Sequence, residues 1–169
     1  MNHVTSEQQI IEALVARGQT VALAESLTGG LVVARLIDVP GASAAVRGGV
    51  VAYHNAVKAW LLGLDREALD SLGAVRESVA IEMAEAVRSR LESGVTADYG
   101  LATTGVAGPD ADPDTGAPPG QVYLAVSGPE STHWVSHLEL SGNRAEIRRA
   151  ATDAALELLG QALGLDKRE

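Results

Sequence analysis

Apolar residues along the chain form two kinds of segment. Runs that are apolar on both faces predict strands buried inside a sheet, and they lie at residues 20–24, 48–53 and 99–104. Segments whose apolar residues share one face predict helices, and they lie at residues 5–18, 31–37, 56–62 and 78–93. Helices interleaved with buried strands indicate an α/β fold.

The last third of the chain adds a hairpin and a helix. Residues 121–127 and 132–140 read as two strands joined by a Gly-Pro turn. Asn143 and Glu146 have the spacing of a capping box at the start of a final helix. The hairpin makes the sheet mixed, so we expect a three-layer α/β/α sandwich with a mixed, mostly parallel sheet.

One domain is expected for residues 1–169. That length buries roughly 70% of the surface that the unfolded chain exposes, and no internal repeat divides the sequence. The first predicted helix has its own start signal, because Thr5 and Gln8 also have capping-box spacing.

Polar residues interrupt the apolar pattern where strands end. In α/β sheets, ligands bind beyond the carboxyl ends of the strands, which selects the segments 25–30, 53–58 and 103–109. The first segment, ESLTGG, joins a strand to a helix, and the unpaired N–H groups of a helix start favour an anion. The alternative is that Ser26 or Thr28 caps the helix and the glycines only form the turn.

Composition excludes several classes of function. The formal charge is −9 and aromatic residues make up 3% of the chain, which argues against a nucleic-acid partner. The sequence has no cysteine, so thiolate chemistry is excluded. It shows neither a signal peptide nor an apolar run of membrane-spanning length, so we expect a cytoplasmic protein with no membrane partner.

Lys58 is the candidate base for a serine nucleophile. Eleven of the thirteen basic residues are Arg, and Lys167 lies in the terminal tail, so Lys58 is the one internal amine. A neutral lysine can deprotonate serine if burial lowers its pKa, whereas Arg stays protonated. A compositional bias against lysine is the alternative explanation for the count, and His54 is a competing base near the same strand end.

The acidic loop after the third strand offers a different chemistry. Asp110, Asp112 and Asp114 alternate as in a calcium loop, but Pro113 interrupts the pattern and the required glycine comes one position late, at Gly116. We therefore expect no metal site and a solvated loop over a pocket.

Three segments together resemble a known family: AESLTGG at 24–30, RGGVVAYHNAVKAWLLG at 47–63 and TTGVAGPD at 103–110. They are similar to the C-terminal domain of the competence/damage-inducible protein CinA, which also occurs as a stand-alone nicotinamide-nucleotide amidase. The resemblance spans nearly the whole chain. It implies hydrolysis of the carboxamide of nicotinamide mononucleotide to nicotinic acid mononucleotide and ammonia, without a cofactor or metal, in a homo-oligomer.

The resemblance also assigns roles to residues. Ser26 matches the nucleophile, Lys58 the general base and Tyr53 the tyrosine that assists them. The residues expected to bind or position the substrate are Glu25, Thr28, Gly29, Gly30, Asn55, Thr104, Gly105, Gly108, Arg144 and Arg148. Among them, backbone N–H groups near Gly29, Gly30 or Gly105 would hold the oxyanion. The phosphate would sit at the glycine-rich helix start with Arg144 or Arg148, unless these arginines are surface residues of the last helix.

The sequence departs from the family pattern in three places. Leu27 replaces a common Cys, His54 replaces a common Ser, and the acidic loop lacks the Lys usual just before its last Pro-x-Gly. Two other functions stay open at this point. One is a nucleotide-binding or partner-binding module without turnover, and the other is an amidase for a different amide.

Overall fold

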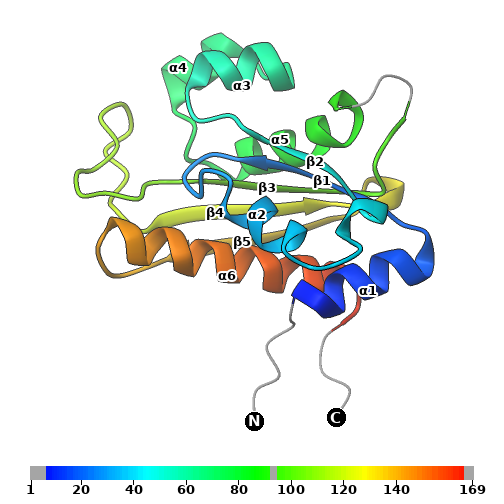
Figure 1. The fold of residues 1–169 in the computed structure, drawn as a ribbon. Coiled ribbons are helices and arrows are strands. Elements are labelled where there is room, and N and C mark those ends of the chain that lie inside the picture. Colours follow the sequence, from blue (N-terminus) through cyan, green and yellow to red (C-terminus); the bar gives the residue numbers. More distant parts are fainter. Residues whose placement is uncertain (1–6, 92–94, 166–169) are drawn as a thin grey trace.

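One mixed five-stranded sheet forms the middle layer of the protein in the computed structural model, which describes residues 7–91 and 95–165 (Figure 1). The strands are β1 (Val21–Glu25), β2 (Val46–Val51), β3 (Tyr99–Gly105), β4 (Gln121–Ser127) and β5 (His133–Glu139), arranged in the order β2-β1-β3-β4-β5. β1 pairs in parallel with β2 and β3, whereas β4 pairs antiparallel with β3 and β5. β4 thus runs against the other four strands.

Helices cover both faces of this sheet. On one face lie α1 (Glu7–Arg17), α2 (Leu31–Ile37) and α6 (Arg144–Ala162), and on the other lie α3 (Asn55–Leu62), α4 (Arg66–Leu72) and α5 (Glu77–Arg90). Two short 3₁₀ turns, Ala42–Ala44 and Pro129–Ser131, complete the described elements. The expected three-layer α/β/α sandwich with a mixed sheet is confirmed.

The two faces of the sheet differ in the size of their side chains. In β1, Val21 and Leu23 point to the α6 side, and Ala22 and Ala24 point to the α5 side. Small side chains allow α5 to pack closely on the sheet. Where α5 contacts β3, a Cβ on Gly100 would lie 1.9 Å from the Ala84 carbonyl oxygen of α5, so only glycine fits there.

Most sequence-predicted elements are present, with shifted ends. The second strand lies at Val46–Val51 instead of 48–53, and Gly18 ends α1 with a positive φ, as expected. The Asn143 capping box is also confirmed, whereas Thr5 lies outside the described residues. Helix α4 was not predicted from the sequence. Its signal was Asp65, whose side chain accepts from the N–H of Ala68 and caps the helix.

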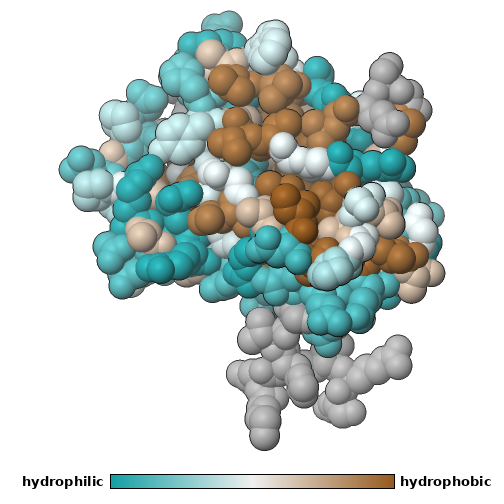
Figure 2. All heavy atoms as spheres, in the orientation of Figure 1, coloured by the Kyte–Doolittle hydropathy of each residue, from teal (hydrophilic) through white to brown (hydrophobic). Residues whose placement is uncertain are grey.

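Strand β2 forms one edge of the sheet. Apolar side chains gather on the face of the molecule that Figure 2 shows. Val51 of β2 and Ile37 of α2 are among the exposed apolar residues. Within the two described stretches of chain, no helix combines the length and the apolar character needed to cross a membrane.

The carboxyl ends of β1, β2 and β3 lie together along one edge of the sheet, the edge at which these strands end and not the edge formed by strand β2. The loop 106–120 projects at this edge, at the left of Figure 1, where α6 also begins. The three segments that the sequence selected therefore lie together, because parallel neighbours in a sheet end on the same side.

Candidate active site

A serine and a lysine from separate segments contact each other at this edge. Ser26 directly follows β1, and Lys58 lies in the second turn of α3. The Lys58 Nζ donates to Ser26 Oγ at 3.2 Å and to the Tyr53 carbonyl oxygen at 3.0 Å. Lys58 is 1% exposed and is among the largest fully buried side chains, while Ser26 is 6% exposed. The amine is thus shielded from water and held by two oxygen atoms.

Burial changes the proton affinity of this amine. Because the charged form loses its hydration, burial lowers the pKa of Lys58 to about 8. A substantial fraction of the amine is therefore neutral at mildly alkaline pH. In that form, one N–H still donates to the Tyr53 carbonyl, and the lone pair is free to accept the Ser26 proton.

A cavity of about 250 Å³ opens onto this pair. Its walls come from α3, from the turn after β3, from the acidic loop and from the start of α6. The sequence-predicted site residues that line it are Ser26, Tyr53, Asn55, Lys58, Thr104, Gly105, Gly108 and Arg144. Five separate segments of the chain therefore contribute residues to the lining of this cavity.

Tyr53 contributes two hydrogen-bond acceptors to the walls of this cavity, its main-chain carbonyl and its phenol oxygen. Its main-chain carbonyl accepts from Lys58, whereas its phenol oxygen accepts from Arg144 Nη2 at 2.9 Å, and the residue as a whole is 58% exposed. Arg144 Nη1 also donates to the carbonyl of Gly108 at 2.6 Å. Arg144 thus ties two walls of the cavity together, and Lys58 reaches Ser26 directly, without the phenol between them.

The remaining predicted polar residues of the lining support its walls. The buried Thr104 hydroxyl donates to the Ala74 carbonyl at 2.9 Å, and Asn55 Nδ2 donates to the Leu69 carbonyl at 3.3 Å. His54, the competing base, is exposed, and its Nδ1 accepts from a main-chain N–H to cap α3. That lone pair is therefore not available to Ser26.

Glu25 caps α2 from inside the protein. It is 1% exposed, and its carboxylate accepts from the N–H groups of Gly30, Val32 and Val33 at 2.8 to 3.2 Å. The Thr28 hydroxyl adds a bond of 2.6 Å to the same carboxylate. The helix start that the sequence suggested for a phosphate is therefore occupied by a side chain of the protein, and Glu25, Thr28 and Gly30 do not line the cavity.

Arg148 and Gly29 also support this turn instead of facing the cavity. Arg148 donates to the carbonyls of Leu27 and Thr28 at 2.9 and 2.8 Å. Gly29 has a positive φ, and a Cβ there would lie 3.0 Å from the Arg148 guanidinium. Arg148, the second arginine expected at the phosphate, is thus a structural residue that holds the turn at residues 26–30.

Replacing Glu25 with glutamine is expected to destabilise the protein by about 2 kcal/mol, because hydrogen bonds to a charged acceptor are lost and an amide N–H₂ meets N–H donors. Urea unfolding measures the change. Glu82→Gln, at an exposed position of α5, is the matched control and should leave the midpoint unchanged. Equal midpoints for all three proteins would contradict the capping role.

Unpaired backbone donors lie elsewhere than the sequence suggested. The N–H groups of Gly29 and Gly30 already donate to Ser26 and Glu25. Within the described part of the chain, the N–H groups of Leu27, Ala107 and Gly108 donate to no protein acceptor, and all three residues line the cavity. The position of Leu27 directly after Ser26 was the available signal, since α/β-hydrolases use the N–H after their nucleophilic serine for the oxyanion.

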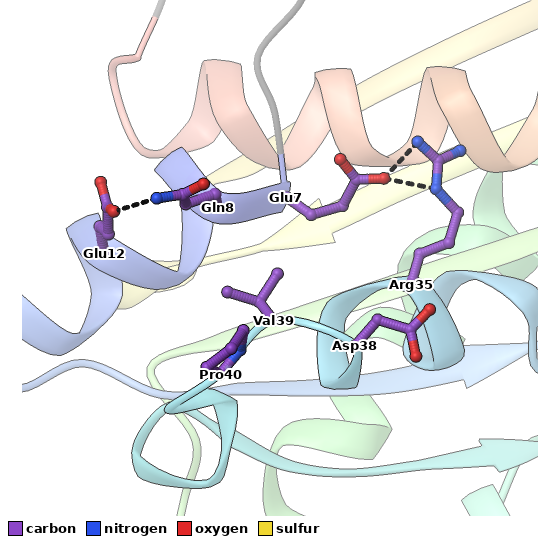
Figure 3. A pocket seen from close by; sticks show the side chains of 7 residues that line it. All are labelled: Glu7, Gln8, Glu12, Arg35, Asp38, Val39 and Pro40. Carbon is purple, nitrogen blue, oxygen red and sulfur yellow. Dashed lines mark hydrogen bonds and ion pairs between the residues drawn. The ribbon is translucent and has the colours of Figure 1, made fainter.

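A second, larger cavity lies away from this pair. It has a volume of about 740 Å³ and lies between α1 and the end of α2, where Arg35 is paired with Glu7 (Figure 3). The lining residues, all drawn in Figure 3, are Glu7, Gln8, Glu12, Arg35, Asp38, Val39 and Pro40. They include neither a hydroxyl nucleophile nor a buried amine, so chemistry and not size identifies the candidate active site.

Comparison with known proteins finds relatives that cover nearly all of this chain. A CinA-like protein of Frankia casuarinae is 48% identical over 157 residues, which cover 93% of this chain and 35% of that relative. The chain thus spans about a third of the length of the curated relatives it matches. Their names do not state a reaction.

Solved structures of similar length share the fold. A competence/damage-inducible protein from Agrobacterium tumefaciens is 34% identical with a TM-score of 0.84, and the match covers 94% of this chain and 93% of that one. A CinA superfamily protein from Klebsiella pneumoniae is 28% identical with a TM-score of 0.86, covering 98% and 99%. The family model described as the CinA C-terminal domain matches residues 3–163, and this chain therefore belongs to the CinA C-terminal domain family.

Proposed function

We propose that this protein is an amidohydrolase that converts nicotinamide mononucleotide to nicotinic acid mononucleotide and ammonia. The observation that carries the proposal is the buried Lys58 amine in contact with Ser26 Oγ at the floor of a cavity. The family resemblance supplies the substrate, because its pyridinium ring carries a carboxamide that such a pair can attack. No metal or cofactor takes part in the proposed reaction.

The first step is proton transfer from serine to lysine. With Lys58 neutral, the Ser26 hydroxyl donates to Nζ. The amine stays oriented because one of its own N–H groups donates to the Tyr53 carbonyl. As the proton moves to Nζ, Ser26 Oγ forms a bond to the carboxamide carbon and the carbonyl electrons move to oxygen. The cationic pyridinium withdraws electrons and makes that carbon more electrophilic.

The resulting oxyanion needs hydrogen-bond donors. The N–H groups of Leu27, Ala107 and Gly108 are unpaired within the described chain and belong to residues that line the cavity. A donor in such a position is typically worth about 3 kcal/mol of transition-state stabilisation. We propose these three groups as the oxyanion donors, in place of those at Gly29 and Gly30.

Collapse of the intermediate releases ammonia. Protonated Lys58 gives its proton to the amide nitrogen as the C–N bond breaks, which leaves a Ser26 ester and a neutral amine. Water then donates a proton to Lys58 and attacks the ester carbon. The Ser26 oxygen leaves with that proton, and the acid product departs.

Ammonia release from nicotinamide mononucleotide tests the proposal. Purified protein should produce ammonia and nicotinic acid mononucleotide in equal amounts, measured by coupled assay and chromatography. The competing proposal is a nucleotide-binding or partner-binding module of the family, which would bind the mononucleotide without producing ammonia. Free nicotinamide and the dinucleotide, assayed beside it, identify an amidase with another preferred amide. The homo-oligomer and the cytoplasmic location remain predictions, and light scattering measures the first of them.

A further inference from the structure

A chain of hydrogen bonds connects three buried side chains to the main chain of Ser26. Glu25, Thr28 and Thr103 are each at most 1% exposed, and none of them lines the cavity. The Thr28 hydroxyl donates to the Glu25 carboxylate at 2.6 Å, and the hydroxyl oxygens of Thr28 and Thr103 lie 2.8 Å apart. The Ser26 N–H donates to the Thr103 hydroxyl oxygen at 3.3 Å.

The carboxylate at one end fixes the direction of each bond in this chain. The Thr28 proton is used on Glu25, so the Thr28 oxygen can only accept from Thr103, because a hydroxyl has one proton. The Thr103 proton is then used as well, and its oxygen accepts from the Ser26 N–H. Hydrogen bonds in such a chain polarise one another in a buried setting. A side chain that lacks a hydroxyl cannot take the place of Thr103.

These bonds fasten the turn at residues 26–30 to β3 at two points. The first is the main chain of Ser26, whose N–H also donates to the Thr103 carbonyl at 3.0 Å and so continues the pairing of β1 with β3. The second is the hydroxyl of Thr28, which lies two residues further along the turn and is held by Thr103. The position of Ser26 relative to the sheet therefore depends on one threonine of β3.

Thr103 and Thr104 point to opposite faces of β3, because side chains alternate along a strand. Thr104 lines the cavity and donates to the Ala74 carbonyl. Thr103 lies on the other face and contacts the turn that carries Ser26. An effect of Thr103 on the reaction must therefore pass through Ser26 and not through contact with a ligand.

On the basis of the proposed hydrolysis, we infer that Thr103 is a positioning residue for Ser26. Its hydroxyl fixes the turn, and the fixed turn keeps Ser26 Oγ at 3.2 Å from the Lys58 amine. A displacement of about 1 Å between reacting groups can cost about 100-fold in rate. Loss of this hydroxyl therefore slows proton transfer from Ser26 while the lining of the cavity stays intact.

The variant Thr103→Val tests this role, because valine has the shape of threonine and lacks the hydroxyl. We expect the kcat for ammonia release from nicotinamide mononucleotide to fall at least about tenfold. The KM should change far less, since Thr103 does not line the cavity. Thr103→Ser keeps the hydroxyl and should retain most of the activity.

Thr20→Val is the matched control at the other end of the same pair of strands. Thr20 is buried just before β1, and its hydroxyl donates to Asp98, just before β3, at 3.0 Å. Both valine variants lose a buried, hydrogen-bonded hydroxyl, so both should lower the urea midpoint. Only Thr103→Val should lower kcat. Equal kcat values for the two valine variants, or a serine variant as slow as Thr103→Val, would overturn the positioning role.

A measurement that needs no turnover follows the Lys58 amine itself. The chain has two lysines, Lys58 and Lys167, so isotope labelling of lysine gives two side-chain signals whose titration can be followed by NMR. The Ser26 oxygen accepts from Lys58 and thereby favours its charged form. If Thr103→Val displaces Ser26, the measured pKa of Lys58 should fall, as it should in Ser26→Ala. Thr20→Val should leave it unchanged.

The outcomes separate this inference from the proposed function. If the unmodified protein releases no ammonia, the hydrolysis fails, and the titration alone decides the role of Thr103. A lower Lys58 pKa in Thr103→Val but not in Thr20→Val supports the role, and equal values in all three proteins overturn it. If ammonia is released and Thr103→Val changes neither kcat nor the titration, the hydrolysis stands without the positioning role. If circular dichroism shows that Thr103→Val does not fold, Thr28→Val replaces it, because it breaks the same chain at the next hydroxyl.

Discussion

Lys58→Met is expected to lower the kcat for ammonia release at least about 10³-fold, because the Ser26 proton then has no acceptor. Methionine has a similar length and is apolar, so it can fill the buried space that Lys58 leaves. Steady-state kinetics with nicotinamide mononucleotide measure the loss, and binding of the substrate should change far less. Ser26→Ala should cause a loss of the same size, since the two residues act as one unit.

The variant Lys58→Arg tests whether position 58 must accept a proton or must only carry a positive charge. Arginine stays protonated, so this variant should be as inactive as Lys58→Met if the amine is the base. Retained activity in the arginine variant would contradict the mechanism. Its circular dichroism spectrum shows whether the larger guanidinium is accommodated.

The pH profile of the unmodified protein gives an independent check on the base. The pKa of Lys58 is lowered to about 8 by burial, and the proposed mechanism requires the neutral amine. Activity should therefore rise with pH, reach half its maximum near pH 8 and level off above it. A profile that is flat from pH 6 to 10 would exclude Lys58 as the group that titrates.

The sequence predicted the layers and the meeting of Ser26 and Lys58 for a simple physical reason. Both follow strands that run in parallel, and parallel strands deliver the residues after them to one edge of the sheet. Lys58 was also identifiable as a chemical anomaly, because it is the one lysine among the arginines of the chain interior. Topology and residue chemistry therefore sufficed for the core of the site.

Other parts of the site depend on how the chain turns after the strand, which spacing does not determine. Glu25 adjoins Ser26 in sequence, but its side chain turns toward the start of α2 and does not line the cavity. Arg148 and Arg144 are four residues apart on the same helix, yet Arg148 supports the turn at residues 26–30 and Arg144 lines the cavity. Their spacing places both arginines on the same face of α6, and their different contacts depend on the three-dimensional packing around each side chain.

The cost of burying Lys58 gives the second large prediction, that Lys58→Met stabilises the protein at neutral pH. In the folded protein, burial lowers the pKa of Lys58 from 10.5 to about 8. Below pH 8 both states bind the proton, and the folded state carries the full penalty of a buried charge, roughly 3 kcal/mol for this shift. Methionine removes that penalty, so urea unfolding at pH 7 should show a gain of about that size.

The stability advantage of Lys58→Met over the unmodified protein should disappear as the pH rises. Between pH 8 and 10.5 the unfolded state binds more protons than the folded state, so the unmodified protein becomes more stable with pH while Lys58→Met does not. Arg149→Met, which removes a charge from an exposed position of α6, should stay within about 0.5 kcal/mol of the unmodified protein at every pH. An advantage of Lys58→Met that persists at pH 10.5 would mean that packing, and not the buried amine, explains it. If the unfolding free energies of the unmodified protein and of Lys58→Met become equal at pH 10.5, the protein gives up stability at neutral pH to hold an amine able to lose its proton.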